Sequence, residues 1–214
     1  MTIVNESKKY HGRDVYLSYA RQRNLSEVKS MVNYKRDCML KRRIKLISFK
    51  ECVGKELYEI YQDIPKEEIG STNKMNSISY EEFKGKCNEL IDEETIENTE
   101  IHTTTSRFIL YDNNKPIGEV GIRTMLNDFW KNKGSQINYK VRRSERQNGY
   151  GNIIFELALI EAKKLGFNKV RINCDDNNIA SKKVILKNGG IVDIKNYKTK
   201  DGSSSSYIIN LDEK

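Results

Sequence analysis

Apolar residues alternate with polar ones in some segments of the chain and recur at helical spacing in others, which predicts a succession of strands and helices. The alternating segments, which predict strands, are 44–49, 107–111, 117–122, 135–141, 169–174, 191–197 and 207–211. The segments with helical spacing are 51–61, 80–91, 153–165 and one that ends at about 187. This order predicts an α+β (α/β layered) domain in which helices flank a mixed central sheet.

Local signals place the ends of several elements. Ser79 stands three residues before Glu82 and is expected to cap the helix that starts at 80. Gly166 is expected to close the helix of 153–165, because glycine adopts the left-handed conformation that ends many helices. The polar segment 70–77 is predicted to be a loop, and so is the glycine- and serine-rich run 201–206, which should be flexible.

The positive charge of the chain is concentrated near its start. The net charge is +8, and residues 1–43 hold 11 Lys and Arg against 4 Asp and Glu, whereas the rest of the chain holds 27 against 26. We expect a basic helical N-terminal extension over 1–43 and one domain over 44–214. The extension is either a solvated helix that packs by one side, which we prefer, or an arm for nucleic acid or anionic membrane surfaces.

Several classes of protein are disfavoured by what the sequence lacks. It contains no apolar run long enough to span a bilayer and no apolar signal core near its start. Its four cysteines have no C-x-x-C spacing and it has two histidines, so we expect neither a metal site nor a disulfide framework. These features indicate a cytoplasmic protein with reduced thiols.

The most informative segment is Arg146-Gln147-Asn148-Gly149-Tyr150-Gly151, which joins a predicted strand to a predicted helix. A glycine-bearing loop there leaves backbone N–H groups unpaired at the positive end of the helix dipole, which suits a phosphate. Glycine pairs at such turns are also common without any ligand. A Walker A loop is absent, and a dinucleotide fingerprint needs three glycines and an earlier position in the chain.

A second polar segment follows the next predicted strand, where Asn178 and Ser181 begin a helix that ends before Asn188-Gly189-Gly190. Short polar side chains at a helix start accept hydrogen bonds from its first N–H groups, so Asn178 could be an ordinary N-cap. The glycine loop, the next strand and this N-x-x-S helix start occur in a fixed order and spacing. Together they indicate a ligand site more specifically than any one of them alone.

These motifs resemble the GNAT superfamily of N-acetyltransferases, from about Arg43 to the C-terminus. Residues 118–211 look like a bacterial branch of predicted GNAT acetyltransferases, whose members often have histidine at the positions of Thr124 and Gln136 and proline at that of Arg143. The resemblance implies that acetyl-CoA (coenzyme A) binds to the loop 146–151 and to the strand ending at Val141. It also implies that the Asn178 and Ser181 side chains touch the pantetheine and phosphate arms.

The resemblance further implies direct attack of an amine on the thioester. Glu119 is our candidate for the base that accepts the amine proton, although it could equally be a surface carboxylate paired with Arg123. Tyr139 could contact the acetyl group or the acceptor, or simply pack in the core. Many family members place a tyrosine acid seven residues after the helix-start asparagine, where this chain has Ile185. An unassisted thiolate could also leave, since a thiol has a pKa of about 8.5.

Three functions remain open at this stage. The first is an N-acetyltransferase that acts on a small-molecule or protein amine, without contact with membranes. The second is an acyl-CoA-binding protein without catalytic activity. The third is a nucleic-acid-associated protein that acts through residues 1–43, which we consider unlikely. The family resemblance is compatible with a homodimer, and it assigns acceptor choice to the segment 51–91 and the last loops, where no motif identifies the acceptor.

Overall fold

The computed structural model describes residues 44–94, 104–124, 134–199 and 202–212. The basic extension expected over 1–43 lies outside these residues. The helices are α3 (Lys55–Asp63), α4 (Tyr80–Asp92), α6 (Tyr150–Lys164) and α7 (Ile179–Lys187), with single 3-10 turns η1 (Phe49–Glu51) and η2 (Arg143–Glu145). The strands are β1 (Ile44–Ser48), β2 (Glu67–Glu68), β3 (Ser71–Thr72), β4 (Thr105–Asp112), β5 (Lys115–Arg123), β6 (Ile137–Val141), β7 (Lys169–Asp175), β8 (Ile191–Thr199) and β9 (Gly202–Asn210).

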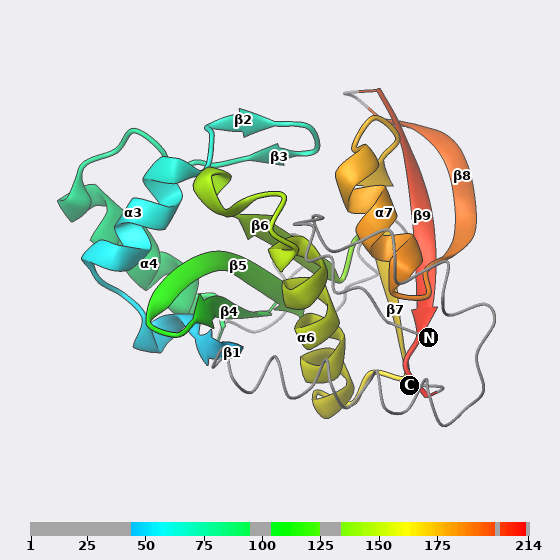
Figure 1. Ribbon diagram of the computed structural model, residues 1–214, viewed down its shortest axis with the longest axis horizontal. Coiled ribbons are helices and arrows are strands. Elements are labelled where there is room, and N and C mark those ends of the chain that lie inside the picture. Colours follow the sequence, from blue (N-terminus) through cyan, green and yellow to red (C-terminus); the bar gives the residue numbers. More distant parts are fainter. Residues whose placement is uncertain (1–43, 95–103, 125–133, 200–201, 213–214) are drawn as a thin grey trace, which may run out of the picture. The chain divides into compact units, whose positions relative to one another are not determined.

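The strands form two larger sheets and one small hairpin. An antiparallel sheet runs in the order β1-β4-β5-β6, and a second antiparallel sheet runs in the order β7-β9-β8. The hairpin β2–β3 forms its own two-stranded sheet and does not pair with either of the larger ones. Helices α3 and α4 lie toward one side of the first sheet, and α6 lies between the two larger sheets on the other (Figure 1). The expected α+β layered fold is confirmed.

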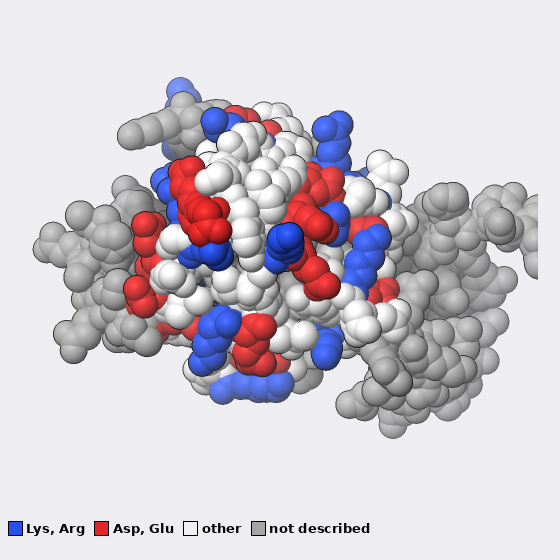
Figure 2. Space-filling view, turned by 90° about the vertical axis from the view of Figure 1, so that its left-hand side faces the viewer, with Lys and Arg blue, Asp and Glu red and all other residues white. Residues whose placement is uncertain are grey.

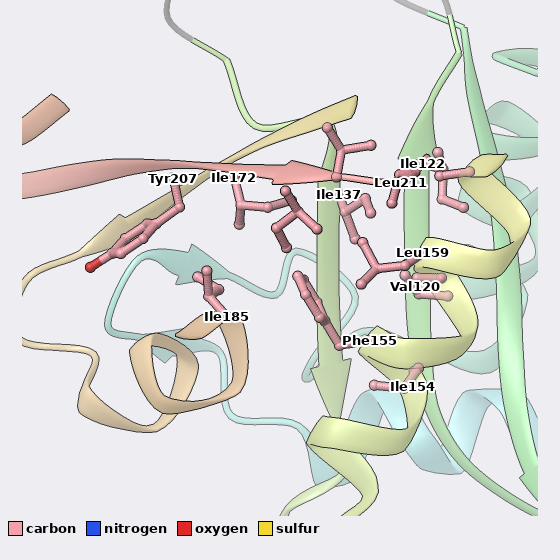
Figure 3. Close-up of a cluster of buried hydrophobic side chains, with 14 of the residues drawn as sticks. Val120, Ile122, Ile137, Ile154, Phe155, Leu159, Ile172, Ile185, Tyr207 and Leu211 are labelled. Atoms are coloured by element: carbon pink, nitrogen blue, oxygen red, sulfur yellow. The ribbon is translucent and has the colours of Figure 1, made fainter. Parts of the chain in front are cut away.

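Two hydrophobic clusters hold these layers together. The larger one joins α6 to both sheets and to α7, and the residues labelled in Figure 3 include members of α6, α7 and strands of both sheets. Phe155 and Ile154 of α6, Val120 of β5 and Ile185 of α7 are each fully buried. The smaller cluster packs α3 and α4 against the opposite face of the first sheet. Burial of a large apolar side chain contributes about 1.5–3 kcal/mol, so these two clusters fix the helices on the sheet.

Two predicted boundaries are confirmed by hydrogen bonds or by backbone conformation. The Ser79 hydroxyl accepts a hydrogen bond from the Glu82 N–H (3.2 Å) and caps α4. Gly166 follows α6 in the left-handed conformation, with a φ of 89°. Helix α6 begins at Tyr150, three residues before the predicted start, because Gly149 already adopts the N-cap position.

The prediction of a flexible loop through the serine run was wrong, because Gly202–Asn210 is the central strand β9 of the second sheet. Asp176 explains part of this difference: its carboxylate accepts hydrogen bonds from the Ser203 and Ser205 hydroxyls, each at 2.6 Å. The prediction of a loop over 70–77 also missed β3, which is too short to show alternation.

None of the helices in the described part of the chain is long and apolar enough to cross a membrane.

Candidate functional site

The first and second sheets meet at the start of β6 and then separate. The Gln136 N–H donates to the Arg171 carbonyl oxygen (2.8 Å), and the Gln136 side-chain Oε1 accepts from the Arg171 N–H (2.8 Å). The Ser135 hydroxyl accepts from the Asn173 N–H (3.3 Å). After this junction β6 and β7 belong to different sheets. The strand β6 therefore has one edge that faces away from β5 and toward β7.

The register of β6 identifies which of its backbone groups face that edge. The Arg142 N–H donates to the Ile117 carbonyl oxygen (3.0 Å). In an antiparallel pair only every second residue exchanges hydrogen bonds with its partner. Lys140 therefore directs its backbone groups toward β5, whereas Tyr139 and Val141 direct theirs toward β7. This is the strand edge on which the sequence predicted that the pantetheine arm binds.

The predicted phosphate loop connects β6 to α6. Gly149, at the N-cap, has a φ of 92°, and Gln147 also has a positive φ, of 65°. The first helical hydrogen bonds are donated to the Gly149 carbonyl oxygen by residues 152 and 153 (3.0 and 3.2 Å). The N–H groups of Tyr150 and Gly151 precede these bonds and lie at the positive end of the helix dipole. The loop thus has the geometry of an anion site.

The side chains in this loop differ in what they contact. The Tyr150 hydroxyl donates to the Asp112 carboxylate (2.5 Å), and its ring is buried in the larger core. Tyr150 can therefore offer an anion only its backbone N–H. Gln147 and Asn148 are exposed. Arg146 donates from Nε to the Val141 carbonyl oxygen (3.0 Å), which ties the loop to the end of β6.

A partly exposed cluster of hydrogen bonds around Asp63 holds the turn η2, just before the loop. The Asp63 carboxylate, at the end of α3, accepts hydrogen bonds from Arg142 Nε (2.9 Å), the Ser144 hydroxyl (2.7 Å) and the Ser144 N–H (3.1 Å). Partial burial raises the pKa of Asp63, but the bonds from Ser144 and Arg142 together outweigh burial and leave that pKa below its ordinary value. No local sequence pattern indicates these hydrogen bonds, because Asp63 lies far from the loop along the chain.

The N-terminus of α7 lies across the gap from the phosphate loop. Asn178 is its N-cap, and its Oδ1 accepts from the Ser181 N–H (3.0 Å). The capping interpretation of Asn178 is therefore correct, but it uses only the oxygen of the amide. The Nδ2 group donates elsewhere, to the Ile69 carbonyl oxygen of the β2–β3 hairpin (3.2 Å).

Tyr139 lies where β6, α6 and α7 come together. Its hydroxyl donates to the Ser181 hydroxyl at 3.4 Å. A Cβ atom on Gly151 would lie 3.8 Å from the Tyr139 ring and 3.8 Å from Val184 of α7. Burial raises the pKa of Tyr139, the Ser181 hydrogen bond opposes that rise, and the net pKa is above the ordinary value. Tyr139 therefore keeps its proton at neutral pH and is a hydrogen-bond donor.

Glu119 lies on the other face of the same sheet. The register pairs Val120 with Tyr139 and Glu119 with Lys140, so Glu119 and Tyr139 point in opposite directions. Glu119 is 9% exposed and accepts a hydrogen bond from the Tyr61 hydroxyl (2.6 Å), with Arg107 Nε 4.0 Å away. The alternative of a surface carboxylate is therefore wrong, and the structure does not bring the two candidate catalytic residues together.

Sequence patterns did not single out Tyr61 and Arg107, the two partners of Glu119. Tyr61 belongs to the segment 51–61, for which only a helix was predicted, and it is 3% exposed. Arg107 also pairs with Glu93, with Nη2 2.8 Å from the carboxylate. Burial and the neighbouring Glu119 carboxylate raise the pKa of Tyr61 well above its ordinary value, so it donates rather than accepts.

A hollow of about 780 Å³ lies beside α3, η2 and the turn between β4 and β5. Its lining includes four carboxylates, of Glu56, Glu59, Asp112 and Glu145, and two basic side chains, of Lys115 and Arg142. The excess of negative charge disfavours phosphate there. We therefore place the candidate anion site at the loop and not in this hollow.

Residues 67–191 match a family model described as an acetyltransferase (GNAT) domain. No curated protein matched the chain.

Three solved structures with a similar fold are acetyltransferases, each 14% identical to this chain. A ribosomal L7/L12 alpha-N-protein acetyltransferase in complex with coenzyme A has a TM-score of 0.56 and covers 80% of this chain and 96% of its own. A spermidine N-acetyltransferase chimera from Vibrio cholerae and hSSAT has a TM-score of 0.55, with coverages of 79% and 96%. The N-acetyltransferase PseH from Campylobacter jejuni, in complex with acetyl coenzyme A, has a TM-score of 0.53, with coverages of 78% and 98%.

Proposed function

Because the chain belongs to the GNAT acetyltransferase family, we propose that it transfers the acetyl group of acetyl-CoA to a primary amine within a ternary complex. The observation that carries this proposal is the position of the phosphate loop. The loop begins α6 with Gly149 in the left-handed conformation, beside the edge of β6 that faces β7. An anion site next to a strand edge with outward-facing backbone groups fits a pyrophosphate that carries a pantetheine arm.

Different residues of the site would bind different parts of coenzyme A. The N–H groups of Tyr150 and Gly151 would hold the pyrophosphate, and the backbone groups of Tyr139 and Val141 would hold the pantetheine amides. Asn178 and Ser181 lie on the far side of the gap, at the start of α7. Two similar folds carry coenzyme A or acetyl coenzyme A by their descriptions, which supports the same ligand here.

In the reaction, the amine nitrogen attacks the thioester carbonyl carbon, a C–N bond forms and the C–S bond breaks. The proton lost by the amine passes to Glu119, directly or through water, and a backbone N–H of β6 stabilises the oxyanion. Tyr139 is the donor for the departing thiolate. It is protonated, and its side chain lies on the face of β6 toward α6 and α7. Positioning of the two substrates alone could supply about 7–11 kcal/mol.

The acceptor is a small-molecule or protein amine. The similar folds include, by their descriptions, enzymes for spermidine and for a ribosomal protein, so both kinds occur on this fold. Acidic and basic side chains alternate on the face that carries α3 and α4, without a single-sign patch (Figure 2). The described part of that face therefore gives no electrostatic support to a nucleic-acid partner.

The first test is calorimetric titration with acetyl-CoA of the wild type and of two glycine variants. Gly149→Val obstructs the loop, and we expect it to abolish measurable binding. Gly166→Val is the matched control, because Gly166 has nearly the same φ (89° against 92°) at the other end of the same helix. Both variants bear similar backbone strain, of about 1–3 kcal/mol, so only the position differs.

Binding that is lost in Gly149→Val and retained in Gly166→Val supports the site. A folded wild type that binds no acetyl-CoA would overturn the proposal. Binding without turnover on any amine in a panel of polyamines, amino acids and peptide N-termini would favour an acyl-CoA-binding protein without catalytic activity.

A further inference from the structure

The β2–β3 hairpin, residues 67–72, contacts both sides of the gap between β6 and β7. It extends from the end of α3 over β6 toward α7 (Figure 1). On one side, the Glu68 carboxylate pairs with Arg146 Nη1 of the phosphate loop (2.5 Å). On the other, the Ile69 carbonyl oxygen accepts from Asn178 Nδ2 (3.2 Å). Between these two contacts, Lys140 Nζ of β6 donates to the Thr72 carbonyl oxygen (3.4 Å).

The two outer contacts engage Arg146, which belongs to the loop 146–151 that the family resemblance assigns to coenzyme A, and Asn178, which the resemblance assigns to the same ligand. Arg146 is the only basic side chain of the loop 146–151, and its guanidinium lies between the Val141 carbonyl oxygen and Glu68. Asn178 has used its Oδ1 on the helix cap, so Nδ2 is its remaining hydrogen-bonding group. On the hairpin, the Glu68 carboxylate and the Ile69 carbonyl oxygen both accept hydrogen bonds. The phosphate and amide oxygens of coenzyme A would accept hydrogen bonds from the same two donors.

We propose that Glu68 is an internal competitor of the cofactor phosphates for Arg146, and thereby sets the affinity for coenzyme A. The inference rests on the proposed function. A carboxylate and a phosphate both take the planar, forked donor set of arginine, and each excludes the other by charge. A phosphate that binds to the Arg146 guanidinium at this position would therefore displace Glu68. The same step frees the hairpin at its contact with the loop.

The pair is of the right strength for this role. The side chains of Arg146 and Glu68 are 37% and 23% exposed, so water screens the ion pair in part. A partly exposed pair is weak enough for a dianionic ligand to replace it. Glu68 thus holds the arginine in place when no anion is bound, and reduces affinity without preventing binding.

The hairpin provides a matched control. Glu67 is next to Glu68, carries the same charge and accepts a hydrogen bond from the Thr72 hydroxyl (3.0 Å) within the hairpin instead. Glu67→Gln therefore removes one negative charge from the same surface and leaves the Arg146 ion pair intact. Any difference between the two variants reports the contact with Arg146 and not the general charge of the hairpin.

The experiment is calorimetric titration of coenzyme A into the wild type, Glu68→Gln, Glu67→Gln, Arg146→Gln and the double variant Glu68→Gln/Arg146→Gln at low ionic strength. We expect Glu68→Gln to bind coenzyme A about two- to fivefold more tightly than the wild type, the range that a partly exposed ion pair supports. Glu67→Gln should stay close to the wild type. In the Arg146→Gln background the gain from Glu68→Gln should disappear, because the two effects are coupled.

The outcomes separate this inference from the proposed function. If the wild type binds no coenzyme A, the proposed function fails first. If it binds and Glu68→Gln gains nothing, binds more weakly or gains no more than Glu67→Gln, Glu68 does not compete for Arg146. A gain that persists without Arg146 leads to the same conclusion. Circular dichroism of each variant shows whether it is folded before its affinity is interpreted.

Discussion

The Tyr61 hydroxyl donates a 2.6 Å hydrogen bond to the Glu119 carboxylate, which joins helix α3 to the central strand β5. Both side chains are buried. Tyr139, the other candidate catalytic residue, lies on the opposite face of the sheet. In the proposed reaction, Glu119 would accept the proton of the acceptor amine on the side of α3 and α4. Tyr139 would donate a proton to the leaving thiolate on the side of α6 and α7.

Substitution of the two candidates should therefore give different kinetic results. Glu119→Gln should lower kcat by on the order of 10²-fold at neutral pH, because the proton acceptor is lost. Its activity should recover as pH rises, since more of the acceptor amine is already neutral. Tyr139→Phe should lower kcat without such recovery. Steady-state kinetics over a range of pH will distinguish them, and an unchanged kcat in Glu119→Gln would assign that residue a structural role.

Tyr61 should make the folded protein sensitive to alkali. Because its pKa in the folded state is raised well above the ordinary value, its stabilising effect is complete below about pH 10 and is lost as pH rises further. Tyr61→Phe should cost about 1–3 kcal/mol near neutral pH, since Glu119 loses a donor. The variant should also show a smaller fall in stability above pH 10. Urea denaturation at several pH values measures both effects.

Tyr58→Phe is the control for that experiment. Tyr58 is on the same helix, and its hydroxyl donates to the neutral Ile78 carbonyl oxygen (2.8 Å). Its loss should cost less than the loss of a donor to a carboxylate. Equal costs for the two substitutions would contradict a special role for the Tyr61–Glu119 bond.

The conformation of the loop 146–151 between a strand and a helix could be predicted from the sequence because its signal is local. Gly149 needs a left-handed conformation, and the residues that follow it form a helix of predictable spacing. The environment of Glu119 could not be predicted in this way. Tyr61 is 58 residues away along the chain, and no local pattern pairs a helix tyrosine with a strand glutamate. The sequence therefore left open whether Glu119 is a base in the site or a surface carboxylate, whereas in the structure it is buried.

Strand β9 shows the same limit for secondary structure. A glycine followed by four serines is typical of a loop, because serine competes for backbone hydrogen bonds and has little to bury. In the structure, β9 pairs on one side with β7 and on the other with β8. Tertiary pairing and the hydrogen bonds of Asp176 outweigh the local preference. The β2–β3 hairpin was missed for a different reason, since two residues per strand show no periodicity.

Asp63→Asn should loosen the turn that precedes the phosphate loop. The pKa of Asp63 is lowered, so its contribution to stability is present above the ordinary Asp pKa of about 3.9 and is lost as pH falls through the lower folded value. We expect the variant to be less stable by about 1–2 kcal/mol at pH 7 and to approach the wild type below pH 4.

Thermal unfolding between pH 3 and pH 7 measures the effect of Asp63→Asn. Asp212→Asn, at an exposed position, should leave the unfolding temperature nearly unchanged across this range. A constant difference between Asp63→Asn and the wild type down to pH 3 would contradict the assigned role of the ionised carboxylate.

Gln136→Leu should weaken the junction between the two larger sheets. Gln136 is 6% exposed, and its Oε1 is the acceptor for the Arg171 N–H. A buried N–H without its acceptor costs about 1–3 kcal/mol. The variant should also bind acetyl-CoA less tightly, because β6 and β7 lose their fixed separation.

Gln62→Leu is the matched control for the junction. The Gln62 Oε1 likewise accepts from a backbone N–H, that of Ser77 (2.9 Å), but the bond is exposed and water can replace it. Chemical denaturation and calorimetry should show a small loss of stability for this variant and unaltered acetyl-CoA affinity. Similar losses in both variants would mean that the Gln136 junction has no special part in the site.

The two hydrogen bonds of Asn178 restrict which residues can stand at that position. Serine, threonine or aspartate would cap α7 as well, since a cap needs only an acceptor. Asparagine alone among the common caps adds an N–H donor, which here reaches the Ile69 carbonyl oxygen. A change to aspartate would keep the helix and remove the donor. The residue at position 178 must therefore supply an acceptor for the start of α7 and a donor for the neighbouring hairpin.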